Sequence, residues 1–183
     1  MGIDDGHFSK DDKSVIVIGT VFRGGEWMDG IITTEIEVDG DNATQKLIEL
    51  VKKTKHLGQL RCIMLNGISL GGFNVVDIKE LSIKTKLPVI VIVRRKPDFR
   101  KINLALKNVN NTEQKMKMII RAGEIYPVTI KDKQIYFQIS NITKENAEKI
   151  IKMSATHSLV PEPLRAAHLI ASGVTTGESK RRA

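Results

Sequence analysis

Residues 14–22 read Ser-Val-Ile-Val-Ile-Gly-Thr-Val-Phe, and this stretch decides the first part of the fold. Its length and its β-branched residues predict a strand. Residues 2–8 form a shorter apolar segment before it, and residues 27–38, which alternate in part between apolar and polar, follow a glycine-rich turn. Three strands joined by short turns predict an antiparallel meander.

The periodicity changes after residue 42, where helical spacing of apolar residues begins. Residues 88–93, Pro-Val-Ile-Val-Ile-Val, are entirely apolar, as expected for a buried parallel strand. Asn74 is the expected N-cap of the second helix, with Asp77 inside that helix. The remaining segments are predicted as helices at residues 43–51, 75–86, 98–107, 112–122, 143–154 and 161–173, and as strands at residues 60–65 and 135–139.

This order of elements predicts an α/β fold with a mixed sheet. A three-strand antiparallel meander comes first, parallel strands follow, and helices cover both faces. The layout is that of the ribonuclease H-like fold, in which carboxylates at the ends of neighbouring strands converge on a divalent metal. We therefore expect one ribonuclease H-like domain over residues 1–175 and a basic, disordered tail over residues 176–183.

Composition excludes several classes of protein. No apolar run approaches the roughly 20 residues of a membrane span, and the polar start predicts no signal peptide. The single Cys62 cannot form an internal disulfide, which favours a cytoplasmic location. The net charge of +8 favours a phosphate-rich partner, although an ordinary basic surface would give the same number. Aromatic residues make up only 4%, which argues against a base-stacking RNA module.

Acidic residues lie at the ends of two predicted strands. An ionised Asp4 in a central strand is costly unless it is paired or binds a cation, but it could also cap a turn before Gly6. Asp39 lies in Val-Asp-Gly-Asp, which is also ordinary turn sequence. Asp5 and Asp41 are expected to be local turn or cap groups, or to lie around the metal ligands without binding the ion themselves. Because Mg²⁺ is held by one or two carboxylates with water and phosphate oxygens, Asp4 and Asp39 are the candidate ligands.

Other candidates lie near the same predicted edge. Asn66 follows the fourth strand and offers an amide oxygen but no charge, and it could equally form an Asn-Gly turn. A basic run closes the strand at residues 88–93 and could contact a phosphate or be an ordinary solvated run; it comprises Arg94, Arg95 and Lys96. His168 lies on an apolar helix face, where a histidine is more often a core residue than a catalytic one.

Several motifs occur in an order that resembles a known family. They are Gly2-Ile-Asp-Asp-Gly6, Val38-Asp-Gly-Asp-Asn-Ala-Thr44, Met64-Leu-Asn-Gly-Ile68, Gly72-Phe-Asn-Val-Val-Asp77, Arg94-Arg-Lys-Pro97 and Pro161-Glu-Pro-Leu-Arg-Ala-Ala-His168. Together they resemble the archaeal endonuclease dU-like family over residues 2 to about 182. That family is similar to endonuclease V, which has a ribonuclease H-like fold.

The resemblance implies a role for each matching residue. Asp4 corresponds to the first-strand catalytic aspartate, Asp39 to the second carboxylate and Asn66 to the third. Lys96, less surely Arg94, corresponds to the strand-end lysine, and His168 to the histidine of the last helix. Three features of endonuclease V are missing: the third carboxylate, the histidine that follows it, and the Pro-Tyr-x-Pro-Gly wedge. The resemblance therefore does not extend to inosine specificity.

The resulting hypothesis is a Mg²⁺- or Mn²⁺-dependent endonuclease of DNA repair that acts on deaminated DNA, with deoxyuridine as a candidate base. Its catalytic residues would be Asp4, Asp39, Lys96 and His168; its metal ligands Asp4, Asp39 and Asn66; and its nucleic-acid contacts Arg94, Arg95, Lys96 and Arg165. One alternative is a non-catalytic protein that binds nucleic acid or another partner and retains the fold. Another is a phosphoesterase of small molecules. The sequence predicts no oligomeric state.

Overall fold

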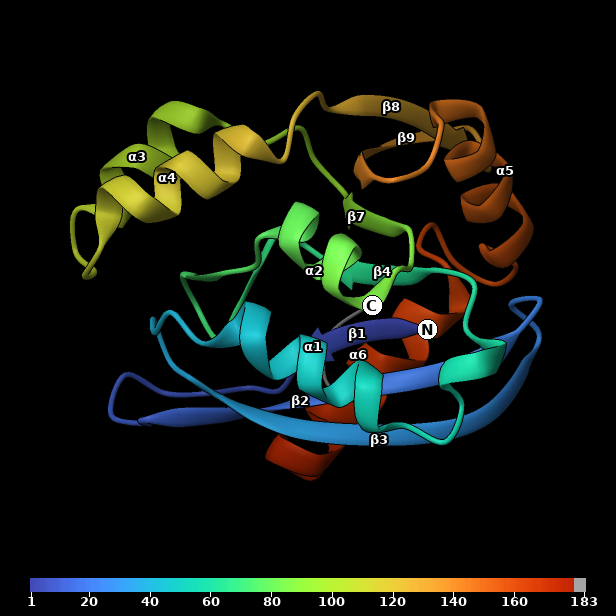
Figure 1. Cartoon of the computed structure of the whole chain (residues 1–183), viewed down its shortest axis with the longest axis horizontal. Coiled ribbons are helices and arrows are strands. Elements are labelled where there is room, and N and C mark those ends of the chain that lie inside the picture. Colours follow the sequence, from blue (N-terminus) through green and yellow to red (C-terminus); the bar gives the residue numbers. More distant parts are fainter. Residues whose placement is uncertain (180–183) are drawn as a thin grey trace.

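The computed structural model describes residues 1–179 and contains one large sheet, a small hairpin and flanking helices (Figure 1). The strands are β1 (Gly2–Asp5), β2 (Ser14–Arg23), β3 (Trp27–Glu37), β4 (Ile63–Asn66), β5 (Ser69–Leu70), β6 (Asn74–Val75), β7 (Val89–Val93), β8 (Tyr126–Ile130) and β9 (Lys133–Ser140). The helices are α1 (Ala43–Lys53), the 3₁₀ turn η1 (Leu57–Gln59), α2 (Ile78–Thr85), α3 (Phe99–Leu106), α4 (Thr112–Arg121), α5 (Lys144–Ser154) and α6 (Glu162–Thr176).

The large sheet confirms the predicted fold class. Within residues 1–179 it has seven strands in the order β3-β2-β1-β4-β7-β9-β8. The first three strands are antiparallel neighbours, as the meander requires. β1, β4 and β7 then run parallel to one another, and β9 returns antiparallel to β7. The ends of β1 and β4 therefore meet at one edge, which is where Asp4 and Asn66 lie.

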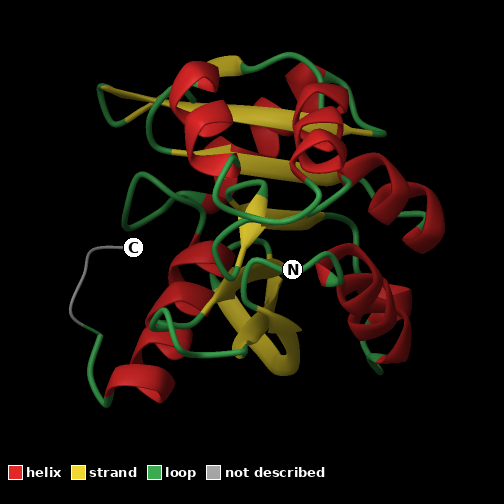
Figure 2. Cartoon of the chain, turned by 90° about the vertical axis from the view of Figure 1, so that its left-hand side faces the viewer, coloured by secondary structure: helices red, strands yellow, loops and turns green. Residues whose placement is uncertain are grey.

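Alternate residues of the central strands supply two different cores. Val89 and Val91 of β7 pack in the cluster that includes residues of α1 and α2. Ile90 and Ile92 pack instead in the cluster that includes residues of α5 and α6. Figure 2 shows helices on both sides of the strands. A strand that is covered on both faces must be apolar at every position, which explains the uninterrupted run at residues 88–93.

Helix α6 lies unusually close to β1. A Cβ at Gly2 would come within 2.3 Å of the carbonyl carbon of Pro163, so only glycine allows this approach. The hydroxyl of Thr20 in β2 donates to the carbonyl oxygen of Pro163 over 2.7 Å and fixes the start of the helix. The helix then runs along β1, which brings His168 to Asp4.

Helices α3 and α4 form a hairpin that projects beyond the sheet (Figure 1). Its apolar residues form a separate small cluster, in which Leu106 and Ile119 pack with Val75 of the β5–β6 hairpin. The basic run at residues 94–96 connects β7 to this helical hairpin. Thus the α3–α4 hairpin packs its apolar residues against β5–β6.

Several predicted details were wrong. Asp77 is the N-cap of α2, since its carboxylate accepts from the backbone N–H groups of Lys79 and Glu80, whereas Asn74 lies in β6. The short strands β5, β6 and β8 were not predicted, because two are only two residues long and the third contains Pro127.

The end of the chain differs from the prediction as well. Helix α6 continues through Gly173 to Thr176 and ends at Gly177, whose φ of 77° suits a helix C-terminus. The predicted disordered tail thus begins at the last residue of this helix, and residues 180–183 of it lie outside the described part of the chain. Among residues 1–179, no helix is both long enough and apolar enough to cross a membrane.

Candidate functional site

The candidate site is centred on the carboxylate of Asp4, which is only 3% exposed. One of its oxygens, Oδ2, accepts a hydrogen bond from Asn66 Nδ2 over 2.9 Å. The same oxygen accepts from His168 Nδ1 over 2.8 Å. Residues from β1, β4 and α6 therefore share one oxygen atom. This Asp4–Asn66–His168 cluster brings together three of the predicted site residues.

His168 is held in a state that favours its charged form. Its hydrogen bond to Asp4 raises its pKa above the usual value, against the opposing effects of burial and of the positive charge of Arg94. The other ring nitrogen, Nε2, is buried and is the only such side-chain atom among residues 1–179 without a hydrogen-bond partner. Buried polar atoms normally have a hydrogen-bond partner, so the unpaired Nε2 can form a hydrogen bond with a group bound at the site.

The cluster opens into a cavity of about 520 Å³. Its lining is mostly polar and consists of Asp4, Asp5, Gly6, His7, Asn66, His168, Ser172 and Thr176. A cavity of this size and polarity can admit a hydrated ion and a phosphate group.

Asp5, expected as a turn or cap group or as a group around the metal ligands, also lines this cavity. Its Oδ2 accepts from the backbone N–H of Gly71 over 2.8 Å. Burial raises the pKa of Asp5 to about 6, and the neighbouring charge of Asp4 adds to the effect, while the hydrogen bond from Gly71 opposes it. A carboxyl with a pKa perturbed in this way is typical of functional sites. The available signal in the sequence was the pair of consecutive aspartates at a strand end.

Asp39 lies in a separate turn between β3 and α1. It has a left-handed backbone with φ of 54°, and its Oδ1 accepts from the N–H of Phe73 over 2.7 Å. It does not line the cavity of the Asp4–Asn66–His168 cluster; it borders a second depression, between the turn and residues 108–111. The two places are linked through Gly71, whose N–H bonds Asp5 and whose carbonyl accepts from the N–H of Asp39 over 2.8 Å.

The predicted basic residues differ in their surroundings. Arg94, Arg95 and Lys96 are exposed after β7, and the positive charge of Arg94 opposes the rise in the pKa of His168 that Asp4 causes. Arg165 is paired already: its Nη2 lies 2.8 Å from an oxygen of the buried Glu162. Residues 94–96 are thus exposed to solvent, while Arg165 has a structural partner.

The donors around Asp4 fit a divalent cation only in part. Within residues 1–179, no three His, Cys, Asp or Glu side chains converge as a metal site. Asp4 offers a carboxylate and Asn66 an amide, and hard cations such as Mg²⁺ prefer oxygen ligands. The NH₂ group of Asn66 faces Asp4, so its amide must turn over to offer oxygen. Together they fit one ion that also retains water and phosphate oxygens.

Comparison with solved structures supports the fold. A crystal structure of a protein of unknown function from Archaeoglobus fulgidus matches with a TM-score of 0.87 and 44% identity, over 96% of this chain and 97% of that one. Endonuclease V of Ciona intestinalis, in complex with a 24mer DNA that contains an inosine followed by a ribo-adenosine, matches with a TM-score of 0.57. At 17% identity, over 91% of this chain and 81% of that one, the second likeness shows the fold alone.

Comparison of sequences shows the family. A relative from Methanothermobacter thermautotrophicus, named only as a UPF0215 protein, is 50% identical over 182 residues, which cover 98% of this chain and 89% of the relative. The family model for endonuclease dU matches residues 1–175. This chain therefore belongs to the endonuclease dU family.

Proposed function

We propose that this protein is a divalent-metal-dependent endonuclease that cleaves deaminated DNA. Its family and its endonuclease V-like fold support a nuclease. The observation that carries the finer proposal is the buried carboxylate of Asp4, shared by Asn66 and His168 at the adjoining ends of two parallel strands. A buried carboxylate beside a cavity is a costly arrangement, and binding of a cation would offset that cost.

Asp4 and Asn66 would hold Mg²⁺ or Mn²⁺, and Asp39 would contribute through the adjacent turn. The ion would supply a water activated for in-line attack on a phosphodiester and would stabilise the leaving oxygen. Asp5 would be available as a proton acceptor, because its pKa of about 6 leaves it mostly ionised at neutral pH while still able to take up a proton.

His168 and the basic residues would act on the phosphate. His168 is held by Asp4 in an orientation that leaves Nε2 unpaired, so a protonated ring would offer this N–H to a phosphate oxygen. Lys96, Arg94 and Arg95 follow β7, and their charges would hold the backbone of the nucleic acid near the cavity. The net charge of +8 agrees with a polyanionic substrate.

The test is nicking of matched DNA duplexes that carry deoxyuridine, deoxyinosine or no deaminated base, with Mg²⁺, Mn²⁺ or EDTA. We expect metal-dependent nicking of the deoxyuridine duplex and little nicking of the unmodified one. Asp4→Asn and Asp39→Ala should both lose activity. Equal nicking by the wild-type protein and by these variants would overturn the catalytic proposal.

A second function is favoured by one specific observation. Asn66 stands where a carboxylate would supply charge, and its amide nitrogen already satisfies Asp4 without any ion. A protein that binds nucleic acid without cleaving it would have no need of that charge. It should bind DNA in EDTA, with affinity that falls steeply with salt and survives Asp4→Ala. Metal-dependent nicking would exclude this alternative.

A further inference from the structure

Lys115 in α4 is a buried charged residue outside the Asp4–Asn66–His168 cluster. It is only 1% exposed and is the largest fully buried side chain among residues 1–179. Burial of an ammonium group costs several kcal/mol unless its donors are all satisfied. An apolar residue would normally occupy such a position, so the surroundings of Lys115 must explain why a lysine lies there.

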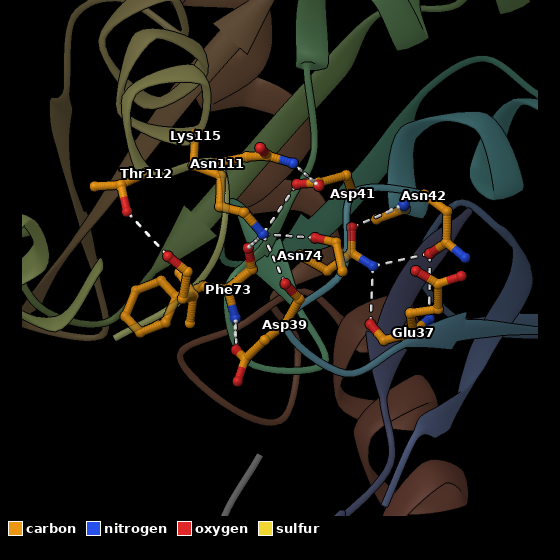
Figure 3. Close-up of polar contacts among 12 residues, drawn as sticks. Glu37, Asp39, Asp41, Asn42, Phe73, Asn74, Asn111, Thr112 and Lys115 are labelled. Carbon is orange, nitrogen blue, oxygen red and sulfur yellow. Dashed lines mark hydrogen bonds and ion pairs between the residues drawn. The ribbon is translucent and has the colours of Figure 1, made fainter. Parts of the chain in front are cut away.

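The ammonium group of Lys115 is surrounded by four oxygen atoms, as Figure 3 shows. Its Nζ donates to the backbone carbonyl oxygens of Asp39 and Gly40 over 2.7 Å each and of Phe73 over 3.0 Å. It also lies 3.0 Å from Oδ1 of Asp41. The side chain thus joins α4 to the turn after β3 and to the segment between β5 and β6.

The contacts of Asp41 strengthen this junction. Burial would raise its pKa, but a hydrogen bond from Asn111 and the contact with Lys115 outweigh that effect, so its pKa lies below the usual value. The amide of Asn111 donates to the second oxygen of Asp41. Two residues of the α3–α4 hairpin therefore hold both oxygens of one carboxylate in the turn.

These contacts stabilise the unusual backbone conformation of Asp39. A left-handed conformation at a residue other than glycine is unfavourable and persists where neighbouring contacts enforce it. Lys115 donates to the carbonyl oxygen of Asp39 and to that of Phe73. The N–H of Phe73 in turn donates to the side chain of Asp39. The second carboxylate oxygen of Asp39 has no hydrogen-bond partner within residues 1–179.

We propose that Lys115 is a positioning residue, whose ammonium group fixes residues 39–41 and so sets the position of Asp39 and its unpaired oxygen. Asp39 borders the second depression and is joined to Asp5 of the cavity through Gly71. Lys115 forms an ion pair with Asp41 and donates hydrogen bonds to the carbonyl oxygens of the turn, while one carboxylate oxygen of Asp39 keeps no hydrogen-bond partner within residues 1–179. The same contact couples the α3–α4 hairpin, which follows the basic run at residues 94–96, to that aspartate. This inference rests on the proposed nuclease function only for the role it gives to Asp39; the structural coupling is independent of it.

The test compares Lys115→Met with Lys117→Met, which removes the same charge from an exposed position two residues further along α4. Amide hydrogen exchange reports the turn directly, because the N–H groups of Phe73 and Asp39 are bonded there. We expect their exchange to accelerate about tenfold or more in Lys115→Met, with no such change in Lys117→Met. The raised pKa of His168, read by imidazole NMR, should be the same in both variants.

Activity gives the second readout. If the wild-type protein nicks DNA, Lys115→Met should lower kcat about tenfold at a nearly unchanged KM, and Lys117→Met should change neither value. If the wild-type protein proves inactive, hydrogen exchange still tests whether Lys115 holds the turn. The nuclease function and the positioning role of Lys115 can therefore fail independently. Should Lys115→Met not fold, Lys115→Gln keeps an amide donor but is too short to reach all of its oxygens, and the same local exchange increase is expected. Wild-type exchange at Phe73 and Asp39, or equal acceleration throughout the sheet, would overturn the proposal.

Discussion

The Asp4–Asn66–His168 cluster and the Asp39 turn are two acidic places built in different ways. In the cluster, side chains from three elements meet at one carboxylate oxygen, and no backbone group within residues 1–179 donates to the carboxylate of Asp4. In the turn, backbone groups and the buried Lys115 hold Asp39, whose second oxygen is unpaired within residues 1–179. The cluster depends on the chemistry of its side chains, whereas the turn depends on the geometry of its backbone.

This difference predicts opposite responses to substitution. Removing a charge from the cluster should abolish function and leave the fold intact, since the charge is costly to bury. Removing the charge of Lys115 should weaken the fold first, because several carbonyl groups lose their donor.

The largest expected effect is that of Asp4→Asn on activity. Loss of the central carboxylate should lower metal-dependent nicking by about a thousandfold. The free energy of unfolding should stay within about 1 kcal/mol of the wild type, because the substitution also removes a buried charge. Nicking assays and urea unfolding measure the two quantities, with the exposed Asp11→Asn as a matched control. A large loss of stability would show that Asp4 has mainly a structural role.

The next largest effect concerns the stability of the turn. Lys115→Met leaves three backbone carbonyls without their buried donor, so the free energy of unfolding should fall by about 2–3 kcal/mol. Lys117→Met should change it by less than about 0.5 kcal/mol. Urea denaturation of both variants makes the comparison. Equal stability of the two variants would mean that the ammonium contacts contribute little.

The pH dependence of stability should reveal Asp5. Its folded-state pKa of about 6 lies above the usual value of 3.8. Between those values the folded protein binds more protons than the unfolded chain, so the free energy of unfolding falls as pH rises through about 6. In EDTA, Asp5→Asn should therefore be more stable than the wild type at pH 8, by about 1–2 kcal/mol after screening by solvent.

His168 also makes the free energy of unfolding fall as pH rises, but over a different range of pH. Its pKa is raised by Asp4, so its stabilising effect is present below the unfolded value and is lost as pH rises through the folded value. Subtracting the Asp5→Asn profile from that of the wild type removes the part of this contribution that comes from Asp4 and leaves the part that comes from the charge of Asp5, which is the last of the causes of the His168 shift. A flat difference between pH 4 and pH 7 would contradict the assignment to Asp5.

The smallest expected effect is that of Asn66→Asp, which restores a charge to the cluster. In EDTA, repulsion from Asp4 should lower the free energy of unfolding by about 1 kcal/mol. With Mn²⁺ present the order should reverse, because a second carboxylate should strengthen metal binding by about tenfold. Thermal unfolding with and without Mn²⁺ measures both, with the exposed Asn103→Asp as control. Destabilisation that persists in Mn²⁺ would indicate that no ion binds beside residue 66.

Sequence predicted the sheet and part of the site for reasons that can be named. The order of the main strands and helices along the chain followed from periodicity, because buried strands and amphipathic helices impose different spacing. Asp4, Asn66 and His168 were each identified, and the sheet brings their elements together. Lys115 could not have been found, since nothing in residues 112–121 distinguishes a buried lysine from its exposed neighbours. Its burial depends on a turn that lies more than seventy residues earlier in the chain.

The role of Asp39 illustrates the same limit. Its sequence, Val-Asp-Gly-Asp, indicated a turn and left open whether the carboxylate also binds metal. The structure gives Asp39 a turn conformation. Its N–H donates to the carbonyl oxygen of Gly71, whose own N–H donates to Asp5 in the lining of the cavity. Its participation in catalysis therefore stays a prediction, which depends on how an ion is shared between the two places.

The most direct test of the metal centre is a crystal soaked in Mn²⁺, with the ion located by its anomalous scattering. The proposed function predicts a peak bonded to a carboxylate oxygen of Asp4 and to the amide oxygen of Asn66, with that amide turned over from its present orientation. A bond or a water bridge to Asp39 would join the cluster and the turn into one centre. A map without a peak at Asp4, at Mn²⁺ concentrations that support nicking, would contradict the proposed metal centre.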